Sequence, residues 1–194
     1  MGGGWHIGHE HPLILKLYLS TVLDDYSHFI VACRLCTHMS ATDVSDTLDD
    51  ALSFTGLNEV KVQHRPRWLN DNGLCYISGE LADYLADNGM THTRGRPYHP
   101  QTQGKIERWH RSMKSQILLN HYYLPSEFQE RLYGFVSYYN HERYHESLDN
   151  LTPADVYYGR GEAILTQREQ IRQNTIALRR KDHYDRQLIH NLMS

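Results

Sequence analysis

The order of the predicted elements indicates a mixed α/β fold, in which helices pack against a mixed sheet and a helical extension follows at the C-terminus. Two runs rich in Leu, Tyr, Val and Ile, residues 15–23 and 29–35, flank a turn-forming D-D-Y-S segment and predict a hairpin. Strand and helix patterns then alternate along the chain. With 194 residues, the chain has room for one domain with a full core and a helical extension.

The first helix is expected to follow the hairpin. Ser40 and Asp43 resemble a capping box, and apolar residues then recur at helical spacing until Gly56. Residues 60–62 and 68–69 predict a short strand region, residues 81–85 a short helix that Gly89 closes, and residues 90–93 another strand. Two prolines and several glycines make residues 95–104 a predicted loop.

Helical patterns dominate the chain beyond this loop. Residues 105–120 place Ile106, Trp109, Met113 and Ile117 on one helical face. Pro125 and the segment 152–153 stand where prolines begin helices, and the last thirty or so residues predict a polar helix or a frayed tail.

The composition favours a folded cytoplasmic protein, with hydrophobic residues at 40% and charged residues at 22%. The longest apolar stretch, residues 13–23, is too short to span a bilayer, and no secretory signal is evident. Cys33 and Cys36 form a C-x-x-C, for which His6, His9 and His11 could complete a zinc site. We prefer buried thiols, because both cysteines lie in a strand-like run and three cysteines provide no disulfide framework.

Charge is distributed unevenly along the chain. The net charge of −3 argues against a protein that coats nucleic acid. Residues 91–120, however, contain six basic residues and only one acidic residue, Glu107. This local excess predicts a surface that binds phosphate groups.

Two carboxylates could take part in catalysis. Asp71 follows a predicted strand, and Glu107 lies near the start of the predicted helix 105–120, with thirty-five residues between them. In isolation, Asp71 is more often a turn residue and Glu107 a residue that complements the helix dipole. Helical geometry, however, places Glu107 on one face with Arg111 and Lys114, away from the apolar face. A metal held by carboxylates beside cations that bind phosphate is what phosphoryl transfer on DNA requires.

Four motifs carry a family resemblance. They are N-D-N-G at 70–73, G-R-P-Y-H-P-Q-T-Q-G-K-I-E-R at 95–108, Y-N-H-E-R-Y-H at 139–145 and L-T-P-A-D-V-Y at 151–157. Together they resemble the successive signatures of the DDE-class integrase-core transposases of bacterial insertion sequences, over residues 17–159. The first two motifs, at D-x35-E spacing, are highly specific.

The resemblance implies an RNase H-like fold of the retroviral integrase type. Three carboxylates would bind two Mg²⁺ or Mn²⁺ ions, and Asp71 and Glu107 match the second and third of them. Lys114 matches a position that holds the DNA of the element's end. The predicted DNA contacts are Lys105, Arg108, Arg111, Lys114, Tyr98 and His99. Expected partners are transposon-end and target DNA, a second copy of the chain, and a separate helix-turn-helix DNA-binding protein, since that module is not seen.

The N-terminus departs from the family pattern. The first catalytic aspartate would lie near Trp5, yet no aspartate precedes Asp24, and Asp24 and Asp25 match a turn. Residues 1–14 therefore suggest an atypical segment of a truncated, frameshifted or mis-started chain. Residues 15–160 would be the catalytic core, and residues 161–194 a basic C-terminal helix or tail.

The predicted function is DNA cleavage and strand transfer, which the missing aspartate would weaken or abolish. One alternative is a non-catalytic remnant that folds, dimerises or binds DNA weakly. Another is a nuclease of the same fold that cuts DNA without preference for element ends.

Overall fold

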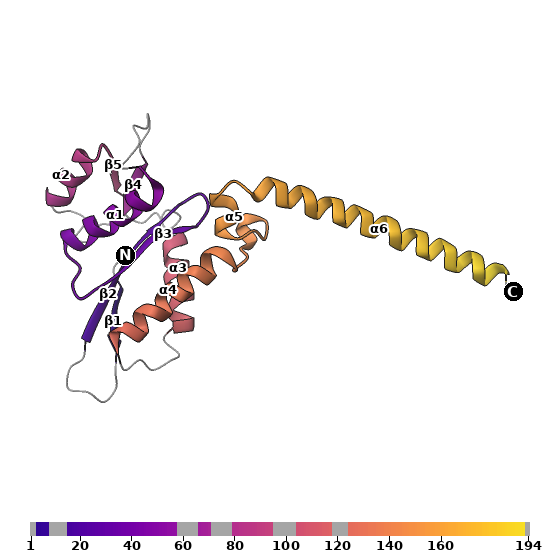
Figure 1. The fold of residues 1–194 in the computed structure, drawn as a ribbon, viewed down its shortest axis with the longest axis horizontal. Helices are drawn as coiled ribbons and strands as arrows, with labels where there is room; N and C mark the ends of the chain where they lie inside the picture. The colour runs from indigo at the N-terminus through magenta and orange to yellow at the C-terminus, as the bar shows by residue number, and fades with distance from the viewer. Residues whose placement is uncertain are drawn as a thin grey trace.

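The chain folds into a sheet with helices on both sides and one long helix that extends away from this body (Figure 1). The computed structural model describes residues 3–7, 15–57, 66–70, 79–94, 104–117 and 124–192. No helix in these ranges is both long enough and apolar enough to cross a membrane.

Three antiparallel strands form the central sheet. They are β1 (Gly3–Ile7), β2 (Leu15–Leu23) and β3 (Ile30–Cys36), with β2 in the middle. Residues 3–7, part of the segment that the sequence set apart as atypical, pair with β2 from Gly3 opposite Leu19 to Ile7 opposite Leu15. The predicted hairpin of β2 and β3 is confirmed. A first strand is therefore present, but none of its five residues is acidic.

The turn between β2 and β3 is built by Asp24. Its carboxylate Oδ2 accepts hydrogen bonds from the Ser27 backbone N–H at 2.8 Å and from the Ser27 hydroxyl at 2.6 Å. The Asp24 backbone N–H donates to the carbonyl of Phe29 at 2.8 Å. Asp24 therefore closes the turn, as the sequence pattern predicted.

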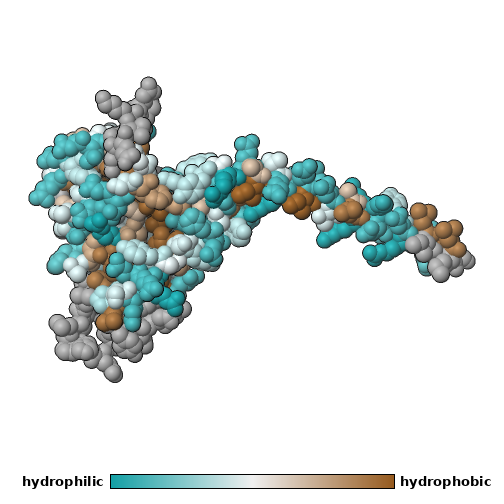
Figure 2. Space-filling view, viewed as in Figure 1, coloured by the Kyte–Doolittle hydropathy of each residue, from teal (hydrophilic) through white to brown (hydrophobic). Residues whose placement is uncertain are grey.

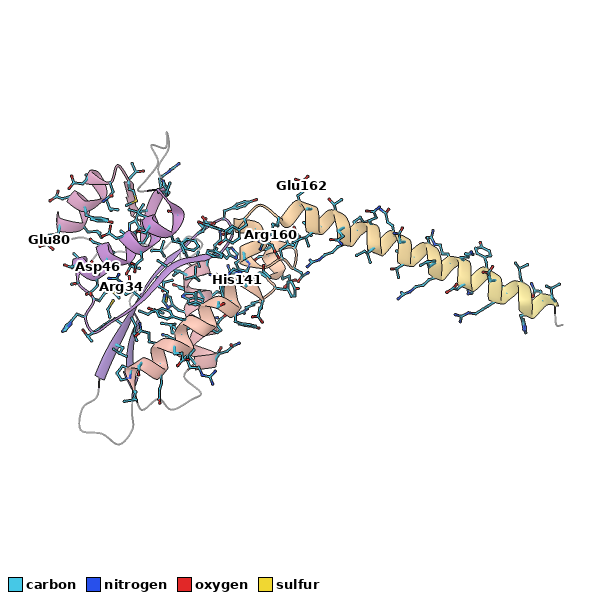
Figure 3. The ribbon with its side chains drawn as sticks, in the orientation of Figure 1. Arg34, Asp46, Glu80, His141, Arg160 and Glu162 are labelled. Carbon is cyan, nitrogen blue, oxygen red and sulfur yellow. The ribbon has the colours of Figure 1, made fainter. Side chains whose placement is uncertain are left out.

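Helix α1 (Ala41–Thr55) packs against one face of the sheet. It begins and ends at the cap residues that the sequence predicted. Ser40 and Asp43 form a reciprocal capping box, and Gly56 ends the helix with φ of 69°, a left-handed conformation that glycine adopts without strain. Arg34 on β3 forms an ion pair with Asp46 of α1 at 2.7 Å (Figure 3). It also pairs with Asp50 of α1 at 2.8 Å.

Helix α2 (Gly79–Asp87) packs beside α1, and β4 (Arg67–Asn70) pairs in parallel with β5 (Thr91–Arg94). Buried residues of these elements form one core cluster, which comprises Ala41, Val44, Leu48, Leu52, Leu81, Leu85 and Met90. The short strands and helix predicted between residues 66 and 94 are confirmed, whereas residues 60–62 lie outside the described residues.

A second core cluster lies on the other side of the hairpin, where α3 (Gly104–Ile117) and α4 (Pro125–His141) pack (Figure 1). It comprises Leu17, Leu19, Ile30, Trp109, Met113, Ile117, Phe128, Leu132, Phe135 and Tyr139. Along β2, Leu17 and Leu19 belong to this cluster and Val22 packs against the first one. The alternation of a strand thus divides its side chains between two cores.

The C-terminal part continues through a 3₁₀ turn (Glu146–Leu148) and α5 (Pro153–Tyr157) into α6 (Gly161–Leu192). The sequence left open whether the last residues form a polar helix or a frayed tail, and the structure shows a helix. Its distal part runs free of the body, and apolar patches alternate with polar ones along it (Figure 2). Ile171, Leu178 and Leu192 are 57, 63 and 84% exposed, so these apolar side chains of α6 are not buried against the body.

Candidate nucleic-acid interface

Helix α3 separates its charged and apolar residues as the sequence predicted. Its exposed residues include Glu107, Arg108, Arg111 and Lys114. Its buried residues are Trp109, His110, Met113 and Ile117, and Ile106 is half-buried against the core. The helix therefore presents one carboxylate among three basic side chains to solvent. Lys114 takes part in further contacts within the fold.

Trp109 fixes the position of this helix. The indole is fully buried, stacks on the ring of Phe135 with 5.4 Å between ring centroids, and meets Tyr139 edge-on at 4.8 Å. Both partners belong to α4. Such aromatic pairs add to the free energy of burial and restrict the relative orientation of two helices. The backbone position of Glu107, two residues before Trp109, is therefore set by a rigid contact in the core.

Lys105, a predicted DNA contact, is engaged within the fold. Its Nζ lies 2.9 Å from Oδ1 of Asp25 and donates to the Asp25 backbone carbonyl at 2.6 Å. The pair ties the start of α3 to the turn of the β2–β3 hairpin. The charge of Lys105 is thus partly compensated before any DNA approaches, which sets it apart from Arg108 and Arg111.

The other predicted catalytic acid follows the parallel pair of strands. Asn70 of β4 is in register with Arg94 of β5, so both strands end at the same edge. Asp71 is the next residue after β4 in the sequence, and residues 95–103 follow β5. Asp71, Tyr98 and His99 lie outside the described residues. Glu107, Lys105, Arg108, Arg111 and Lys114 are the predicted site residues that the structure describes.

The Y-N-H-E-R-Y-H segment has a structural role that the sequence did not reveal. The Asn140 side chain accepts from the backbone N–H of Ile30 at 2.9 Å and donates to the Ile30 carbonyl at 3.0 Å, in a buried position. It thus joins the end of α4 to the start of β3. An isolated polar residue inside an apolar helical face was the available signal, because a buried amide needs partners.

Metal ligands do not cluster among the described residues, where no group of three or more His, Cys, Asp or Glu side chains is arranged to hold a metal ion. Cys33 and Cys36 are free thiols on β3. Burial raises the pKa of Cys33 to about 12 and that of Cys36 to about 11. These raised pKa values agree with the buried thiols that the sequence predicted at these positions.

Comparison with models of protein families identifies the family of this chain. The integrase core domain model matches residues 3–100, and a second integrase core domain model matches residues 88–153. The chain belongs to the integrase core family. The matched ranges include β1, so residues 3–7 are part of the family's domain.

Two of its curated relatives are a retroviral and a retrovirus-like polyprotein. The Gag-Pro-Pol polyprotein of mouse mammary tumor virus (strain BR6) is 31% identical over 100 residues, which are 52% of this chain and 5% of the polyprotein. The Pol-related polyprotein of the mouse intracisternal A-particle MIA14 is 40% identical over 102 residues, 52% of this chain and 11% of that polyprotein. The chain therefore corresponds to a small part of each relative.

Solved structures confirm the predicted RNase H-like fold. The catalytic core domain of HTLV-2 integrase in complex with magnesium aligns with a TM-score of 0.59 at 16% identity, over 79% of this chain and 91% of that one. The catalytic core domain of BIV integrase aligns with a TM-score of 0.56 at 18% identity, over 84% and 95% of the two chains. The chain is thus an integrase core domain with an RNase H-like fold, and the motifs predicted both.

Proposed function

We propose that this chain is the core of a transposase of the insertion-sequence type, a class of enzyme that cleaves and joins DNA, and that Asp71 and Glu107 are the catalytic and metal-binding carboxylates that it retains. The observation that carries the proposal is the position of Glu107 on α3. Its carboxylate is exposed, Arg111 and Lys114 share its helical face, Arg108 follows it in the chain, and Trp109 anchors the helix. Metal ligands and phosphate-binding cations on one rigid helix are suited to phosphoryl transfer.

Carboxylate oxygens fit Mg²⁺ or Mn²⁺, which both prefer hard oxygen ligands. When bound, the metal would polarise the scissile phosphodiester and activate the attacking oxygen. Arg111 and Lys114 would hold the DNA backbone beside the metal, and the Trp109 contact would keep Glu107 in place. Tyr98 and His99, in the predicted loop, would touch bases or sugars.

The proposed site is one carboxylate short of the family's three. Strand β1 has the sequence GGWHI and so provides no acid at the position near Trp5. Two carboxylates compensate the charge of a second divalent ion poorly. We therefore expect the 194-residue chain to bind a single metal weakly and to join no DNA strands.

Substitution at Gly8 tests this function. Gly8 is the first residue after β1, as Asp71 is the first after β4. Gly8→Asp should introduce magnesium-dependent strand joining and tighten Mn²⁺ binding, measured by paramagnetic broadening of NMR signals near Glu107. Gly8→Asn is the matched control and should do neither. Adding Glu107→Gln to Gly8→Asp should abolish both gains. Robust strand joining by the unmodified chain would contradict the missing-ligand explanation and direct attention to Glu10, Asp24 or Asp25.

A non-catalytic remnant is the second candidate, favoured by the absence of an acid in β1. This alternative predicts DNA binding through α3 without metal-dependent chemistry, even in Gly8→Asp. Lys114→Glu should weaken binding and reduce its salt dependence in either case. An unchanged salt slope in that variant would remove Lys114 from the interface.

The wider arrangement is part of the same proposal. The partners would be transposon-end and target DNA, a second copy of the chain, and a helix-turn-helix protein that reads the element's ends. Residues 15–160 would form the core with residues 3–7 completing its sheet, and residues 161–194 would form the extension. The chain would act in the cytoplasm.

A further inference from the structure

A concave surface lies beside the start of α3, between that helix and the connection from α4 to α5. Its volume is about 390 Å³, and its lining residues are Arg108, Arg143, Tyr144, His145, Glu146 and Ser147. Arg108 comes from α3, and the other five are consecutive in the connection. Two segments more than thirty residues apart in sequence thus bring two guanidinium groups to one hollow.

Both arginines are oriented by contacts with uncharged groups. The Arg108 Nε donates to the Gly104 carbonyl at 3.0 Å, and the Arg143 guanidinium lies 5.6 Å from the centroid of the Tyr139 ring. Neither arginine takes part in an ion pair among the described residues. Glu146 is the one acid of the lining, so two positive charges face a single negative one.

The pKa of His145 is lowered by its burial and by the neighbouring positive charges. Its ring packs edge-on against Tyr139 at 4.9 Å, and its buried Nε2 has no hydrogen-bond partner among the described residues. Burial, followed by the charges of Arg143, His28 and Arg108, lowers its pKa to about 4. The imidazole is therefore neutral at pH 7, and an anion in the hollow would raise its pKa again.

We propose that this hollow, defined by Arg108, Arg143 and Ser147, binds a backbone phosphate of the DNA on which the core acts. Paired guanidinium groups match phosphate geometry, and the Ser147 hydroxyl offers a further donor. Successive residues of a helix point about 100° apart, so Arg108 faces away from Glu107. The phosphate in the hollow would therefore lie beside the metal-binding carboxylate of Glu107 and would not be the scissile phosphate. The inference rests on DNA as the substrate.

Metal-free binding of duplex DNA tests the hollow independently of catalysis. Arg143→Gln should weaken binding about five- to tenfold at low salt and reduce the slope of log K against log salt by about one. Arg131→Gln is the matched control, because Arg131 is an exposed arginine of the same helix, roughly 15 Å before its end. It should change binding less than twofold. Glu146→Gln should tighten binding, a result that a merely structural role of the segment would not produce.

Two further measurements separate the possible outcomes. Inorganic phosphate, followed by NMR, should raise the pKa of His145 in the unmodified chain but not in Arg143→Gln, and duplex DNA should displace it. Phosphate that binds without competition from DNA would overturn the assignment to DNA. Equal effects of Arg143→Gln and Arg131→Gln would overturn the hollow while leaving the proposed function intact. Absence of any salt-dependent DNA binding would overturn both.

Discussion

Helices α3 and α6 are both rich in basic residues, yet the structure uses them differently. The 14 residues of α3 include Trp109 and Met113, both fully buried, and the helix packs against α4 and shares a core cluster with residues of the sheet. The 32 residues of α6 leave Ile171, Leu178 and Leu192 largely exposed. Side chains of α6 extend to solvent along its length (Figure 3). Both helices are therefore basic, but α3 is anchored in the core beneath its charges, whereas α6 contacts the body near its start, at Arg168.

The largest expected difference between the two helices lies in stability. Trp109→Ala should lower the free energy of unfolding by about 3–5 kcal/mol, because it removes a buried aromatic ring and leaves a cavity. Ile171→Ala on α6 is the control and should cost no more than about 0.5 kcal/mol. Denaturant unfolding followed by circular dichroism measures both. Equal losses would show that α6 is buried against a partner in solution, since Ile171 is exposed in the single chain.

A smaller difference concerns acid. Burial lowers the folded-state pKa of His110 on α3 from 6.5 to about 4. The unfolded chain thus binds the proton more readily, so the stability from this residue is complete above pH 6.5 and is lost progressively down to about pH 4. The unfolding midpoint should fall over this range, and His110→Phe should reduce that fall. His183→Phe, at an exposed position of α6, should leave it unchanged. Identical pH profiles for the three proteins would exclude His110 as a source of the acid sensitivity.

The smallest expected effect is the removal of the distal part of α6. The start of the helix contacts the body, since Arg168 donates to the Asn150 carbonyl at 2.9 Å and lies 5.7 Å from the centroid of the Tyr144 ring. A chain that ends after Arg172 keeps these contacts. Its free energy of unfolding, measured by denaturant titration, should match that of the full chain within about 0.5 kcal/mol. A concentration-dependent loss of stability in the full chain alone would instead assign α6 to an interface between copies.

The sequence determined the local structure and the family. Ser40, Asp43 and Gly56 delimit α1 because capping depends on neighbouring residues, and the hairpin follows from two apolar runs around a turn. The exposed Glu107 and the buried Trp109 follow from helical periodicity alone. The four motifs were specific enough to indicate the integrase core, which the comparisons show.

Only the tertiary structure decided which distant residues meet. It showed that Lys105 pairs with Asp25, that Asn140 satisfies the backbone of Ile30, and that Arg108 and Arg143 line one hollow. It also paired residues 3–7 with β2, although their composition set them apart from the family pattern. Such contacts depend on how helices and strands pack across long sequence separations, and local propensity and periodicity carry no information about that packing.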